Sequence, residues 1–188
     1  MRNIIREMEA SGWTNSETQS RFTYYHLNYA MGLAKAGNLH SFKMNGILQA
    51  DQGFDIVTFP DSSFEELVEE TYNLYSSNHD PTVLKDVHPF VIFAMYYFAN
   101  ANEDPVTMWH LYTPEENPQT LEAYVVDWQQ EDFHLNELDG LLFESKESLV
   151  GSIVLEKGDI GYYAVEMIVN ETANWGISSI NLDMLEHE

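Results

Sequence analysis

Apolar positions recur at helical spacing through the middle of the chain. Residues 62–76 keep apolar side chains on one face and four glutamates on the other, which predicts an amphipathic helix capped by Asp61 or Ser62. Residues 89–100 read PFVIFAMYYFAN and are apolar on nearly every side, so we expect this helix at the centre of the core. Residues 118–130 return to the amphipathic pattern and predict another helix.

Further helices are predicted towards both ends of the chain. Residues 3–10 carry a short apolar stripe that ends at Ser-Gly, and residues 14–36 begin at a capping box and end before Gly-Asn. In the last quarter of the chain, residues 143–155 and 160–173 are interpreted as two helices separated by Lys-Gly-Asp. These patterns give about six or seven helices in all.

Strand-like alternation is clearest just before the middle helices. Residues 40–49 and 54–59 alternate apolar and polar positions, and residues 50–53 have the composition of a turn. They predict one β-hairpin over residues 40–59. Residues 106–112 are considered as a third short strand. The expected fold class is therefore α+β and predominantly helical.

The length of 188 residues suits one domain with a sizeable core. We interpret residues 1–188 as a single acidic domain, with residues 1–38 as an N-terminal helical hairpin appended to it. The chain has no cysteine, which excludes disulfides and thiolate metal sites. Acidic residues interrupt the only stretch that could be a signal core, and the most apolar run is too short to span a bilayer, so a soluble cytoplasmic protein without a membrane partner is expected.

Charge changes this picture more than any motif does. The formal net charge is −23, and the stretch from Asp61 to Asp139 holds seventeen acidic residues against Lys85 alone. Folding brings these like charges together, which opposes stability and therefore suggests a functional reason for them. Direct binding to nucleic acid is disfavoured, since it requires lysine and arginine for the phosphates.

Motifs for catalysis or cofactor binding are missing from the sequence. It contains no His-Glu-x-x-His, no Gly-x-Ser-x-Gly and no glycine-rich phosphate loop. We therefore expect no catalytic residues, no cofactor and no metal site. A small hydrolase that uses paired carboxylates stays open as an alternative, but the 31 acidic residues do not single out a pair.

The acidic helix at residues 62–76 carries the functional hypothesis. Its four glutamates occupy about 9 Å of helix axis, or one charge per about 2.3 Å, against one per about 1.7 Å in duplex DNA. Further acidic residues could extend this face if their helices lie beside it. The proposed partner-binding residues are Glu65, Glu66, Glu69, Glu70, Glu115, Glu116, Glu122, Asp127, Glu131 and Asp132.

In composition, the chain resembles the small acidic DNA mimics that phages and mobile elements use against restriction or CRISPR nucleases. That resemblance implies an inhibitor that occupies the nucleic-acid groove of a basic protein such as a nuclease, in a bacterial host that is phage-infected or carries a plasmid. The alternatives are an acidic module for another basic protein, and acidity that serves only solubility or high salt. The first 43 residues carry five basic and three acidic side chains, which suggests docking on a second copy and hence a homodimer.

Overall fold

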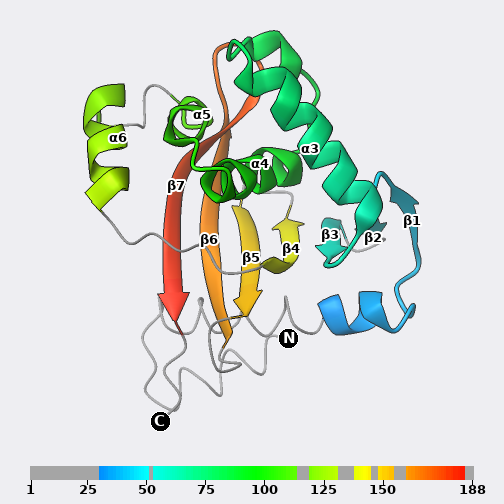
Figure 1. Cartoon of the computed structure of the whole chain (residues 1–188). Helices are drawn as coiled ribbons and strands as arrows, with labels where there is room; N and C mark the ends of the chain where they lie inside the picture. Colours follow the sequence, from blue (N-terminus) through cyan, green and yellow to red (C-terminus); the bar gives the residue numbers. More distant parts are fainter. Residues whose placement is uncertain are drawn as a thin grey trace.

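A computed structural model gives the structure of most of the chain. It describes six segments, namely residues 30–50, 53–113, 119–130, 138–144, 148–154 and 160–184. Within them a twisted sheet carries a layer of helices on one face (Figure 1).

The sheet is a seven-stranded antiparallel meander in which every strand pairs with its neighbour in the chain. Its strands are β1 (Ser41–Met44), β2 (Ile47–Ala50), β3 (Phe54–Thr58), β4 (Leu138–Glu144), β5 (Ser148–Val154), β6 (Ile160–Val169) and β7 (Trp175–Met184). The link from β3 to β4 is the long one. It contains the helical layer, although these two strands pair directly.

The helices between β3 and β4 are α3 (Ser62–Ser76), the short 3-10 helix η1 (Pro81–Leu84), α4 (Pro89–Ala101), α5 (Pro105–His110) and α6 (Leu121–Gln130). They pack in chain order, α3 on α4, α4 on α5 and α5 on α6, and α4 also contacts β4 and β7. Nine of the thirteen residues of α4 are buried, which confirms its predicted place in the core. None of the helices in the described residues is long and apolar enough to cross a membrane.

Strand alternation divides the core between the two faces of the sheet. Val57 and Leu141 belong to the large cluster under α3, α4 and α5. Their neighbours Ile56 and Leu142 belong to a smaller cluster with Met31, which lies in a helix at residues 30–35. Successive side chains of a strand point to opposite faces, so this helix covers the face away from α4.

The predicted fold class is wrong in its balance of helix and strand. The segments 143–155 and 160–173, interpreted above as helices, contribute to strands β4, β5 and β6. Short runs that are apolar on both faces occur in buried strands as well as in buried helices, so periodicity alone does not separate them. Gly151 and Gly161, which disfavour helix, lie inside the misassigned runs.

Two local predictions near the helical layer are also wrong. Residues 106–112 form no β-strand, because Asp104 caps a helix whose first residue is Pro105. The predicted first strand of the hairpin is two strands, β1 and β2, joined at Asn45-Gly46. Both turn residues have positive φ, at 48° and 80°, as a tight hairpin turn of mirror-image type requires.

Helices α3, α4 and α6 are confirmed close to their predicted bounds, and so is the hairpin of β2 and β3. Asp61 is the N-cap of α3, where its side chain accepts the backbone N–H of Phe64. Residues 1–29 lie outside the described residues. The appended helical hairpin and the single domain therefore stay predictions.

Candidate functional site

The outer face of α3 is the most concentrated acidic surface among the predicted site residues. Glu65, Glu66, Glu69 and Glu70 are all exposed. The opposite face buries Phe64, Val68, Thr71 and Tyr75 against the core. The helix contains no lysine or arginine, so no basic side chain of α3 itself neutralises these glutamates.

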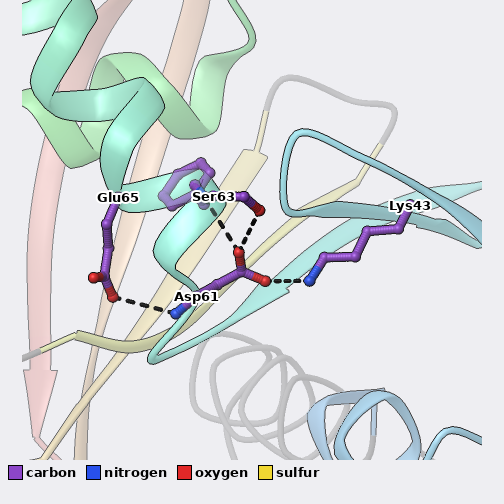
Figure 2. Close-up of polar contacts among 5 residues, drawn as sticks. Lys43, Asp61, Ser63 and Glu65 are labelled. Carbon is purple, nitrogen blue, oxygen red and sulfur yellow. Dashed lines mark hydrogen bonds and ion pairs between the residues drawn. The ribbon is translucent and has the colours of Figure 1, made fainter.

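Asp61 holds the N-terminus of this acidic helix in place (Figure 2). One carboxylate oxygen accepts the Ser63 hydroxyl at 2.7 Å and the Phe64 N–H at 3.2 Å, and the other pairs with Lys43 of β1. The Asp61 N–H in turn donates to Glu65. Burial raises the pKa of Asp61, but the hydrogen bonds from Lys43, Ser63 and Phe64 outweigh it and leave that pKa below its usual value.

The acidic residues of α6 form a separate surface. Glu122 and Asp127 are exposed, and Asp127 accepts the Gln119 amide at 2.8 Å. Figure 1 shows α6 and α3 on opposite sides of α4, so these two residues do not extend the α3 face. The remaining predicted residues, Glu115, Glu116, Glu131 and Asp132, lie outside the described residues.

A partly buried polar cluster joins α3 to α5, and the sequence did not reveal it. Tyr72 donates to Asp104 at 3.0 Å, and the imidazole Nε2 of His79 lies 3.0 Å from the Thr107 hydroxyl. The ring of His79 stacks on that of His110 with centroids 4.2 Å apart. The sequence feature that relates to this cluster is Asp104-Pro105, a pair typical of the start of a helix.

The electrostatics of this cluster favour a structural role. Burial and the Asp104 carboxylate raise the pKa of Tyr72 to about 12, so its hydroxyl stays a donor. Burial lowers the pKa of both His79 and His110, against the opposing effect of Asp104. Within this cluster, the hydroxyl that contacts a histidine belongs to Thr107. Thr107 is fully buried, so this hydroxyl cannot reach a substrate as a nucleophile.

Comparisons with protein-family models, curated proteins and solved structures give no match to this chain. The function of the chain is therefore inferred from the arrangement of its own residues. The described segments contain no group of three or more histidine, aspartate or glutamate side chains that could hold a metal ion.

A third histidine, His88, links β3 to the N-terminus of α4. Its Nδ1 accepts the Phe90 N–H at 3.1 Å, so the ring proton is on Nε2 and is donated to Asp55 at 2.8 Å. Both ring nitrogens are thus used, and neither is left to act as a general base. Burial lowers the pKa of His88, against the effect of the Asp55 carboxylate.

His88 is expected to make the protein less stable as the pH falls. Its pKa is lower in the folded chain than the unfolded value of about 6.5, so the unfolded chain binds more protons as the pH drops through that value. Stability is then lost on going from pH 7.5 to 5.5. We expect His88→Asn, which keeps a capping side chain, to lose less free energy of unfolding over this interval than the wild type does.

Urea denaturation at both pH values measures this difference. The variant His40→Asn is the control, because it replaces an exposed histidine by the same residue. Identical losses for the wild type and His88→Asn would contradict the assignment of His88 as a neutral cap.

Proposed function

We propose that this chain is a non-enzymatic inhibitor that mimics DNA, with the outer face of α3 placed in the nucleic-acid-binding groove of a nuclease or another defence protein. The observation that carries the proposal is the exposure of four glutamates within six residues of a helix that has no basic residue. The helix is fixed at its start by Asp61 and packed along its length on α4. The charges are therefore presented by an ordered surface.

The spacing of these charges is close to that of phosphates on duplex DNA. A groove lined with lysine and arginine attracts such a face over several ångströms, and the attraction weakens as salt is added. The α6 residues Glu122 and Asp127 lie apart from the α3 face and would meet such a partner at a second point. The proposed partner is a basic nucleic-acid-binding protein in the cytoplasm of a bacterial host.

Neutralising the α3 face is expected to weaken inhibition. The variant Glu65→Gln, Glu66→Gln, Glu69→Gln, Glu70→Gln should lose about tenfold to a hundredfold in affinity for its nuclease at low salt, because each charge contact contributes a few tenths to one kcal/mol. The measurement is competition with labelled duplex DNA for a panel of purified restriction and CRISPR nucleases, at two salt concentrations.

A matched control removes four charges from other places. Asp86, Glu103, Glu166 and Glu171 are exposed and lie outside the α3 face. The control variant Asp86→Asn, Glu103→Gln, Glu166→Gln, Glu171→Gln has the same net charge as the α3 variant. It should keep most of the affinity for the nuclease. Equal losses in the two variants would mean that net charge alone acts, and an unchanged α3 variant would refute the site.

The alternative function, an acidic module for a basic protein of another kind, uses the same face. It predicts that the α3 variant loses its partner while duplex DNA does not compete for that partner.

A further inference from the structure

The two edges of the sheet differ in how they are covered. At the β7 edge, the segment after α5 pairs with Ile177. The Thr113 N–H donates to the Ile177 carbonyl at 2.9 Å, and the Ile177 N–H donates to the Leu111 carbonyl at 3.0 Å. Thr113 is fully buried there, with its methyl group close to Gly176. In the described segments, β1 has β2 as its one strand neighbour, and all four of its residues are exposed.

The backbone of β1 has polar groups that point away from β2. The Asn45-Gly46 turn makes Met44 and Ile47 a hydrogen-bonded pair, so alternate residues, Lys43 and Ser41, direct their N–H and C=O outward. Ala50 lies opposite Ser41, and its carbonyl accepts the Gly53 N–H of the β2–β3 turn. This carbonyl therefore points away from β1, as the pattern requires. The outer edge of β1 can therefore pair with another strand.

The side chains of β1 do not protect this edge. Phe42 and Met44 are 63% and 50% exposed, and they share the sheet face of Ile47, which belongs to the core under the helices. Edge strands usually carry charges that prevent pairing. The one charge of β1, Lys43, is held by Asp61 in an ion pair.

The edge is fixed to the acidic helix. Gly46 is buried against α3, so close that a side chain there would meet Phe64 and Asp61. The β1–β2 hairpin is therefore held against the N-terminal turn of α3, the helix that carries the four glutamates.

We propose that β1 pairs with an extended segment of the basic partner, which adds a strand to the sheet while its lysines or arginines face the α3 glutamates. This inference rests on the proposed function and adds a mode of binding to it. Charge selects the occupant, because a second copy of this chain would bring another net charge of −23 and its own α3 glutamates to the same place. Backbone hydrogen bonds would supply affinity, and the basic side chains of the added strand would lie on the sheet face of Phe42 and Met44, because α3 covers that face.

The probe is an acetylated nonapeptide of alternating lysine and valine, titrated into the full-length chain labelled with ¹⁵N. The control peptide has the same side chains and charge, with its backbone amides N-methylated so that it cannot donate to a strand. We expect at least tenfold tighter binding of the unmethylated peptide, together with slower hydrogen exchange at the Lys43 amide. The variant Ser41→Pro, which removes an outward N–H at the start of an edge strand, should lose about tenfold in affinity with its melting temperature preserved.

Equal binding of the two peptides would overturn the inference, and so would unchanged binding by Ser41→Pro. A Lys43 amide that is already protected from hydrogen exchange in the free chain would also overturn the inference. Protection that grows with protein concentration would mean that a second copy occupies the β1 edge, and protection independent of concentration would mean that the chain itself covers it. These results leave the proposed function standing as long as the α3 variant loses its nuclease. If the α3 variant keeps its nuclease, the proposed function fails whatever the peptides do.

Discussion

Replacing Phe90 by alanine is expected to lower the free energy of unfolding by about 3–5 kcal/mol, the usual cost of removing a buried aromatic ring. Phe90 is completely buried at the start of α4. Its ring lies edge-on to His88, with centroids 4.7 Å apart, and to Phe143 of β4 at 6.3 Å. Removing it would leave a cavity between α4 and the sheet, which surrounding side chains fill only in part.

Urea denaturation of the wild type and Phe90→Ala measures this effect. Phe42→Ala is the matched control, because it removes the same ring from a position that is 63% exposed. Its cost should stay below about 1 kcal/mol, as for most surface substitutions. Similar costs at the two positions would contradict the placement of α4 in the core.

The variant Gly46→Ala is expected to cost about 2–4 kcal/mol, for two reasons that add. Its φ of 80° lies where a side chain is strained by about 1–3 kcal/mol. A β-carbon there would also lie 2.6 Å from that of Phe64 and 3.0 Å from the Phe64 backbone nitrogen, so the hairpin must move away from α3.

The variant Gly53→Ala separates these two effects. Gly53 has nearly the same φ, 81°, but a β-carbon there would meet nothing within 4 Å. It should show the backbone strain without the clash, and the difference between the two melting temperatures then measures how tightly the hairpin packs on α3. A larger loss at Gly53 than at Gly46 would contradict that packing.

Helices with local signals were predictable from the sequence, and strands that depend on distant partners were not. Asp61 and Pro89 mark the starts of α3 and α4 within the sequence itself, so their bounds follow from capping and periodicity. The strands β4, β5 and β6 are apolar runs whose state is decided by pairing with one another. The Asn45-Gly46 turn is the exception, because its two residues are a strong hairpin signal that the predicted hairpin did not use.

The candidate site divides in the same way. Exposure of the α3 glutamates follows from their spacing relative to the apolar positions of one helix. Whether α6 lies beside α3 depends on how α4 and α5 pack between them, which no local pattern contains. The pairs Tyr72–Asp104 and Asp55–His88 join residues more than thirty positions apart, so only the fold brings them together.

The long link between β3 and β4 also has a consequence for how the chain folds. Thr58 pairs with Gly140, about 80 residues further on, although their strands are direct neighbours in the sheet. Closing a loop of that length costs entropy, and the cost is offset only when the intervening helices have packed. The hairpins of β4 to β7 join residues close in sequence and can form early. We therefore expect the pairing of β3 with β4 to form late in folding, and this pairing joins a three-stranded and a four-stranded meander into one sheet.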